Sequence, residues 1–232
     1  MNTLLIFIAA ILPALALWLY VWKKDTQPEP ASQLIKAILW GVAICIPVAF
    51  TEQWVQTMLF GAGGSPTSLF GTTAEAFFVA AIPEETAKLF VLWLILRKNP
   101  YFDEHYDGIV YAVCVGLGFA AVENFFYLYG QENWLGTAIG RALLSVPGHY
   151  AFAVLMGYYD SLYHFVERSA KNAVSILLVP VMAHGVYDAL ALSGSVNPLI
   201  GGISFSVLIY FCIKMQKEAQ RKLISMVERD RK

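Results

Sequence analysis

The chain has 232 residues, of which 58% are hydrophobic and 14% are charged, and its formal net charge is −1. An ordinary soluble domain is about 45–50% apolar and about 25% charged, so this composition excludes a soluble globular protein. The three cysteines lie far apart within apolar runs, at Cys45, Cys114 and Cys212. This spacing argues against a disulfide framework and against a metal site built from clustered thiolates.

Seven apolar runs are long enough to cross a bilayer, which takes about 20 residues of helix for a hydrocarbon core about 30 Å thick. In chain order they fall at about 3–22, 34–59, 74–96, 108–129, 138–164, 173–192 and 199–214. Backbone groups in hydrocarbon must be hydrogen-bonded within their own segment, and these runs are too long and too uniformly apolar for barrel strands. The sequence therefore predicts an all-α polytopic membrane bundle of about seven transmembrane helices, with one domain at 1–213 and a basic cytoplasmic tail at 214–232.

The basic residues lie mainly on one side of these predicted helices. Of the 16 lysines and arginines, 14 follow or flank the inner ends of the first, third, fifth and seventh runs, whereas the loops 60–73, 130–137 and 193–198 hold none. Because cytoplasmic loops are enriched in Lys and Arg, we expect the N-terminus outside and the C-terminus in the cytoplasm. Lys23 and Lys24 follow the first apolar run instead of preceding it, which favours an uncleaved anchor over a secretory signal.

Polar and ionisable side chains interrupt four of the predicted helices. An ionisable group near the bilayer centre costs about 2.5–3.5 kcal/mol, so each one invites a functional explanation. The residues are Glu84, Glu85 and Lys88 in the third helix, Glu123 and Asn124 in the fourth, His149 in the fifth, and His184 and Asp188 in the sixth. At about 1.5 Å of rise per residue, the paired glutamates and both histidines fall at one depth near mid-membrane, with Glu123 and Asp188 about one turn nearer the outer face.

The spacing of these side chains has chemical content. Lys88 lies four residues after Glu84 and three after Glu85, so its ammonium can neutralise either carboxylate on the same helix face. His184 and Asp188 are four residues apart, so the carboxylate can hold an imidazole N–H and fix which ring nitrogen faces the site. Prolines, which remove a helical hydrogen bond and open room at mid-depth, stand nearby at Pro83, Pro147 and Pro180.

Four other ionisable residues lie near the predicted ends of the spans, namely Glu52, Glu75, Arg141 and Asp160. We interpret them as interfacial. For Arg141 we expect a side chain that extends toward the outer interface or pairs with Glu75.

The motifs in these helices resemble those of the PrsW family of bacterial intramembrane proteases. They are Glu84-Glu85-Thr86-Ala87-Lys88 (E-E-x-x-K), Phe119 to Asn124 (F-x-x-x-E-N), Pro147-Gly148-His149 with Gly157, and His184-Gly185-Val186-Tyr187-Asp188. The resemblance covers roughly residues 75–190, and the four motifs together are specific. The family is distantly similar to the CAAX prenyl protease and bacteriocin-immunity group. That group typically carries E-E-x-x-x-R and a final Asn-bearing motif, where this chain has Lys88 and Asp188, so prenylated-peptide chemistry is not implied.

The resemblance implies an intramembrane endopeptidase in the bacterial plasma membrane, with its catalytic core in the helices at about 74–192. Its substrate would be a single-pass membrane protein, by resemblance an anti-sigma factor that is first cut on the extracytoplasmic side to release a stress response. The expected partners are this substrate and the lipid bilayer, with no nucleic acid.

The expected chemistry is peptide hydrolysis by an activated water, and each polar residue has an expected role. Either Glu84 or Glu85 is the general base, and His149 and His184 either donate to the oxyanion or bind a metal. The supporting roles are that Lys88 holds the carboxylate pair, Asp188 orients His184, and Glu123 and Asn124 support the site or position the substrate.

The same residues leave alternatives open. A zinc ion held by His149, His184 and Glu85 is a plausible catalytic set, but no ligand spacing in the chain is diagnostic of zinc, so a glutamate mechanism without a cofactor is favoured. A proton-coupled transporter or channel also uses Glu, His and Lys inside the membrane. It would favour carboxylates spread along a path and inverted repeats, whereas here the groups share one level. A non-catalytic membrane scaffold is the third alternative.

Overall fold

The computed structural model describes residues 3–231, which form seven continuous helices. Five of them are α1 (Thr3–Trp22), α2 (Ala31–Phe60), α5 (Asp107–Leu128), α8 (Ala170–Leu192) and α9 (Pro198–Asp230). The other two are composite: α3 (Leu69–Ala74), η1 (Glu75–Ala81) and α4 (Ile82–Leu96) run into one another, as do α6 (Trp134–Gly140), η2 (Arg141–Ser145), α7 (Val146–Ser161) and η3 (Leu162–Val166). A short 3₁₀ turn, η4 (Ser193–Ser195), follows α8.

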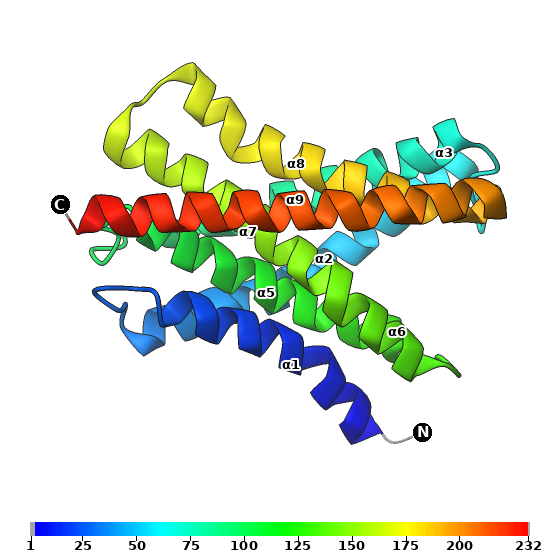
Figure 1. Ribbon diagram of the computed structural model, residues 1–232, viewed down its shortest axis with the longest axis horizontal. Coiled ribbons are helices and arrows are strands. Elements are labelled where there is room, and N and C mark those ends of the chain that lie inside the picture. The colour runs from blue at the N-terminus through cyan, green and yellow to red at the C-terminus, as the bar shows by residue number, and fades with distance from the viewer. Residues whose placement is uncertain (1–2, 232) are drawn as a thin grey trace.

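Six of the seven helices are long and apolar enough to cross a membrane, by length and composition. The remaining one, at 69–96, carries Glu75, Glu84, Glu85 and Lys88, and these charges set it apart from the others. The beginning of α1 and the end of α9 lie at opposite ends of the bundle (Figure 1), as an odd number of crossings requires. The predicted all-α polytopic bundle of about seven helices is confirmed, and its orientation in the membrane stays a prediction from the basic residues.

Helix α5 lies at the centre of the bundle and packs against α1, α2, α4 and α7 (Figure 1). Every residue in 107–120 is buried. Small residues let the neighbouring helices approach closely, as is common between membrane helices. At Gly157 a Cβ atom would lie 2.3 Å from the carbonyl oxygen of Gly108, so the backbones of α5 and α7 are in contact there.

The two helices that begin at residues 69 and 134 share a local feature, a π-helical stretch before a proline. In each, a π-helical stretch ends just before the proline of a motif: Ile82 N–H bonds to the carbonyl of Phe77, and Val146 N–H bonds to that of Arg141, both five residues back. Pro83 and Pro147 cannot donate to the carbonyl four residues earlier, and a π-turn absorbs that break within a helix. The loss of a helical hydrogen bond expected at these prolines takes the form of a π-turn, and the open room at mid-depth stays a prediction.

Helix α9 continues without a break across the predicted end of the last span. Its inner half packs on the bundle through buried side chains at intervals of three or four residues, namely Met215, Ala219, Leu223 and Met226. At its end, Asp230 accepts hydrogen bonds from the backbone N–H groups of His105 and Tyr106. The boundary between a domain at 1–213 and a tail at 214–232 stays a prediction, and residues 214–230 form packed helix.

Candidate active site

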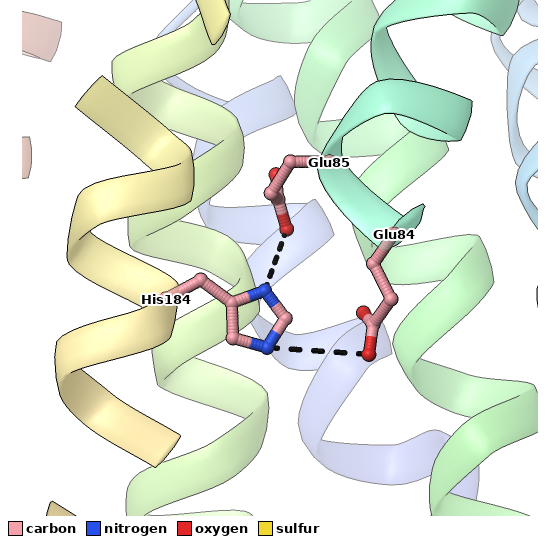
Figure 2. Close-up of side chains that lie close together, drawn as sticks. All are labelled: Glu84, Glu85 and His184. Carbon is pink, nitrogen blue, oxygen red and sulfur yellow. Dashed lines mark hydrogen bonds and ion pairs between the residues drawn. The ribbon is translucent and has the colours of Figure 1, made fainter. Parts of the chain in front are cut away.

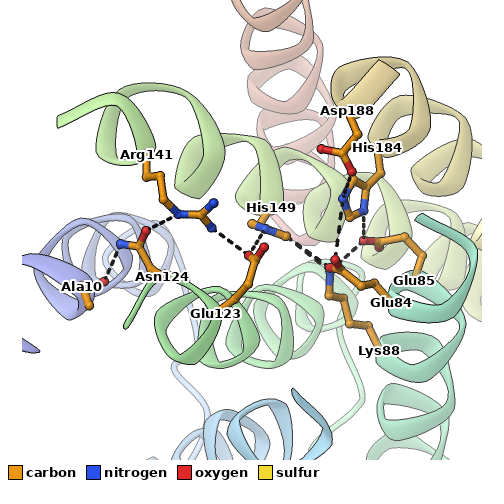
Figure 3. A network of polar contacts seen from close by, with 10 residues as sticks. All are labelled: Ala10, Glu84, Glu85, Lys88, Glu123, Asn124, Arg141, His149, His184 and Asp188. Carbon is orange, nitrogen blue, oxygen red and sulfur yellow. Dashed lines mark hydrogen bonds and ion pairs between the residues drawn. The ribbon is translucent and has the colours of Figure 1, made fainter. Parts of the chain in front are cut away.

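Lys88 stands at the centre of the polar cluster (Figure 3). Its Nζ lies 2.8 Å from Glu84 Oε2, 2.8 Å from Glu85 Oε1 and 3.3 Å from His149 Nδ1. An ammonium has three hydrogens to donate, and here three acceptors surround it. The same group lies 4.3 Å from the ring centroid of Phe119, which adds a cation–π contact. The helix spacing therefore brings the ammonium to both carboxylates, and α7 completes its environment.

His184 is held at both ring nitrogens. Its Nδ1 lies 2.9 Å from Glu85 Oε1 and its Nε2 lies 3.1 Å from Asp188 Oδ2. The ring also stacks on Phe152 with centroids 4.7 Å apart. Figure 2 shows that the Nε2 side of the ring faces Glu84 as well, with Glu84 Oε1 at 4.0 Å. Carboxylate oxygens only accept hydrogen bonds, so the ring is positioned by acceptors on both sides.

His149 faces a different carboxylate. Its Nε2 lies 2.7 Å from Glu123 Oε2, while its Nδ1 faces Lys88 and lies 4.0 Å from Glu84 Oε2. Because the Lys88 ammonium only donates, His149 Nδ1 accepts and Nε2 carries the hydrogen that Glu123 receives. The rings of His149 and His184 are 5.4 Å apart at their centroids, with Glu84 near both.

Arg141 belongs to this cluster, contrary to the interfacial role expected from the sequence. Its guanidinium lies 3.0 Å from Glu123 Oε2, and its Nε donates to Asn124 Oδ1 at 2.6 Å. Asn124 in turn donates to the backbone carbonyl of Ala10 at 3.1 Å, which ties α1 to the site. The expected alternatives, a side chain extended to the interface or a pair with Glu75, are wrong because the half-buried carboxylate of Glu123 on α5 lies within reach.

Glu52, on α2, is half-buried, and its interfacial role stays a prediction. The signal that could have placed Arg141 is pairing, because a guanidinium deep in a membrane protein is stable only beside a partner. Counting residues from the end of a span does not reveal the partner.

The cluster is enclosed, and it becomes more accessible toward one side. Glu85 is fully buried and Glu84 is 4% exposed, whereas the side chains of Glu123 and Asp188 are 19% and 21% exposed. The accessible residues are those predicted to lie about one turn nearer the outer face. Of the residues expected at the site, the structure brings together the two glutamates, both histidines, Lys88, Glu123, Asn124 and Asp188.

Three residues form a candidate metal-binding group, because ligand atoms of Glu84, Glu85 and His184 all lie within 4.8 Å of one another. One carboxylate oxygen in it, Glu85 Oε2, is buried and has no hydrogen-bond partner. The set expected from the sequence contained His149 in place of Glu84. In the structure both nitrogens of His149 face other groups, Lys88 and Glu123.

Comparison with known proteins identifies one family, by a family model and by individual relatives. Residues 29–215 match the family described as PrsW family intramembrane metalloprotease. The chain is similar to the Protease PrsW of Geobacillus kaustophilus, with 36% identity over 216 residues that cover 91% of each chain. It is also similar to the Protease PrsW of Bacillus subtilis, with 32% identity over 223 residues that cover 95% of this chain and 97% of the relative. No solved structure matches the chain.

Proposed function

The chain belongs to the PrsW family of intramembrane proteases, and from this premise we propose that it hydrolyses a peptide bond of a single-pass membrane protein with a water activated by Glu84. The observation that carries the choice of base is the position of Glu84 between the histidines, 4.0 Å from His149 Nδ1 and 4.0 Å from His184 Nε2. Glu85 is less suited, because its Oε1 already accepts from Lys88 and from His184.

In the proposed reaction Glu84 takes one proton from water while the water oxygen bonds to the carbonyl carbon of the scissile peptide. The carbon–nitrogen bond then breaks, and the proton on Glu84 passes to the leaving nitrogen. At rest the Nε2–H of His184 faces Asp188, and in the proposed reaction His184 shares this hydrogen with the oxyanion that forms in between. Lys88, which touches Glu84 at 2.8 Å, keeps the carboxylate in place between the two steps.

The other residues of the cluster position these groups. Glu85 and Asp188 hold the two nitrogens of His184, so its ring cannot rotate away from Glu84. Glu123 holds His149 with Nδ1 toward the Lys88 ammonium. Such partners commonly change activity about 10- to 100-fold when they are removed.

The family description names a metalloprotease, and a metal bound at Glu84, Glu85 and His184 would polarise the scissile carbonyl and acidify a bound water. The donor set does not fit a metal as it stands. The Lys88 ammonium bridges both carboxylates at 2.8 Å, and both nitrogens of His184 already face carboxylate oxygens. The proposed reaction therefore uses the ammonium as the cation of the site and routes no step through a metal.

The proposed substrate is the membrane anchor of an anti-sigma factor, which rests on the motif resemblance stated above. A substrate of this kind fits a site that lies among membrane helices and becomes more accessible toward one side, at Glu123 and Asp188. The relatives named above carry the name of a protease, so the transporter and scaffold alternatives are set aside.

The test is cleavage of tagged single-pass anti-sigma substrates by the purified protein in liposomes. We expect Glu84→Gln to lower kcat by about 100- to 10,000-fold, the range of general acid–base catalysis, and Glu75→Gln, the same change on the same continuous helix, to leave it unaltered. If the Glu84→Gln variant keeps the wild-type activity, Glu84 is not the general base. If a chelator abolishes cleavage by the wild-type protein and zinc restores it, the metal-free mechanism is replaced by a metal-dependent one. If folded wild-type protein cuts none of the substrates, the proposed substrate is contradicted.

A further inference from the structure

A chain of polar contacts runs from the site to α1 (Figure 3). From His149 it passes to Glu123 at 2.7 Å, to Arg141 at 3.0 Å, to Asn124 at 2.6 Å and to the carbonyl of Ala10 at 3.1 Å. The guanidinium also lies 3.9 Å from the ring centroid of Tyr127. Nothing in the proposed reaction uses Arg141, yet it contacts both residues of the Glu123-Asn124 pair.

The π-turn η2 explains how Arg141 and His149 reach one carboxylate. In a regular α-helix two residues eight apart differ by about 80° in direction. Because a π-turn accommodates one extra residue, the η2 turn that begins at Arg141 brings the two side chains to within about 20° of each other. The break imposed near Pro147 thus aligns Arg141 and His149 on the face that α5 presents with Glu123.

The charge of Arg141 matters because Glu123 is only partly accessible. Taking one partner away from a buried ion pair leaves the other charge uncompensated, which is strongly unfavourable. With the guanidinium present, Glu123 is held at its Oε2 by Arg141 and presents the same oxygen to His149 Nε2. Without it, the carboxylate is free to turn toward the more accessible side of the cluster.

We infer that Arg141 is a positioning residue: it fixes Glu123 at His149 Nε2 and thereby, together with Lys88 at Nδ1, holds His149 in its Nε2–H form. The inference deepens the proposed function and rests on it for its kinetic consequence. The arrangement of His149 itself is a property of the resting protein and can be measured without a substrate.

The experiment combines kinetics and ¹⁵N NMR of the full-length protein in liposomes of phosphatidylethanolamine and phosphatidylglycerol. We expect Arg141→Met to lower kcat about 10- to 100-fold, as loss of a positioning partner commonly does, with KM changed by less than about twofold. Arg141→Lys keeps the charge and should recover most of the rate. The matched control is Arg97→Met, since Arg97 also lies over an aromatic ring, Trp93, but outside the cluster.

The NMR measurement separates positioning from a general loss of structure. The ¹⁵N signals of His149, assigned against a His149→Gln variant, should show one Nε2–H form in wild-type protein and in Arg141→Lys, and a mixture of ring forms in Arg141→Met and Glu123→Gln. An unchanged Nε2–H form in Arg141→Met overturns the inference, whatever its kcat. If Arg141→Met does not fold, Arg141→Gln takes its place, because it removes the charge and keeps an amide that can donate to Asn124 Oδ1. If wild-type protein cuts no substrate, the proposed function fails while the NMR result still decides the role of Arg141.

Discussion

The ring of Phe77 lies against the backbone of Gly185, the residue that follows His184. A Cβ atom built on Gly185 would come within 2.4 Å of the Phe77 ring. The π-helical stretch η1 and helix α8 therefore meet directly beside the site, and a side chain larger than hydrogen at this position must push them apart.

Gly185→Ala should accordingly separate η1 from α8. Overpacking of this kind costs about 1–3 kcal/mol of stability. Because it should also displace His184 from Glu85, we expect the cleavage rate to fall strongly although the protein remains folded. Thermal unfolding and the cleavage assay measure the two effects. Gly202→Ala is the matched control, because a Cβ there meets nothing within 4 Å, and an equal effect of both changes would contradict the packing argument.

Lys88→Met should destabilise the protein as well as inactivate it. The ammonium neutralises two buried carboxylates, and removing one partner of a buried ion pair costs about 3–5 kcal/mol. The measurement is the free energy of unfolding in detergent, compared with Lys98→Met, whose side chain is exposed in the turn just after the same helix. In the background of Glu84→Gln with Glu85→Gln, Lys88→Met should cost much less, and an undiminished cost would show that the ion pairs are not its cause.

Glu29, which lies far from the site, should make the stability of the protein depend on pH. It lies in the loop between α1 and α2, accepts a hydrogen bond from Tyr111 at 3.0 Å, and faces Asp25, Asp103 and Asp107. Burial, and secondarily the charges of Asp25 and Asp103, raises the pKa of Glu29 from 4.5 to about 7, against the lowering effect of its hydrogen bonds with Tyr111 and Asp107. The folded protein therefore binds more protons than the unfolded chain between these values, so its stability falls as the pH rises from about 4.5 to about 7.

Replacement of Glu29 by Gln removes this proton linkage. The melting temperature of wild-type protein should decrease between pH 5 and pH 7.5, and the Glu29→Gln variant should show a smaller decrease. A slope of the same size in both proteins would mean that Glu29 does not titrate in this range.

The inner half of α9 should contribute to stability although it lies beyond the predicted last span. Leu223 is fully buried and its neighbour Ile224 is 47% exposed. A buried Leu→Ala change costs about 2–5 kcal/mol, so Leu223→Ala should lower the free energy of unfolding by that amount and Ile224→Ala by much less. Similar values for the two variants would indicate a tail that detaches from the bundle.

The sequence predicts the helices and most of the cluster because both follow from short-range rules. Lys88 reaches Glu84 and Glu85 by helix spacing alone, and His184 reaches Asp188 in the same way. The depth estimate brings His149 to the same level, which is close enough for the contact with Lys88. These relations require only the rise and the period of an α-helix.

The contacts that the sequence does not predict depend on the faces that neighbouring helices present. Arg141 contacts Glu123 because of the π-turn η2 and the way this helix packs against α5, and a hydropathy pattern predicts neither feature. The packed half of α9 is missed for a related reason: its charged residues lower the mean hydropathy, while Met215, Ala219 and Leu223 still form a stripe at helical spacing. A period of four residues within a charged segment was the available signal.

The position of three charges within two turns of one helix also bears on how the nascent chain enters the membrane. Glu84, Glu85 and Lys88 form their ion pairs inside a single segment, so the pairs can form before any other helix has packed. A segment with paired charges is cheaper to transfer from the translocon into lipid than one with three separate charges. The ion pairs that order the site thus also reduce the insertion cost of the charged residues that form them.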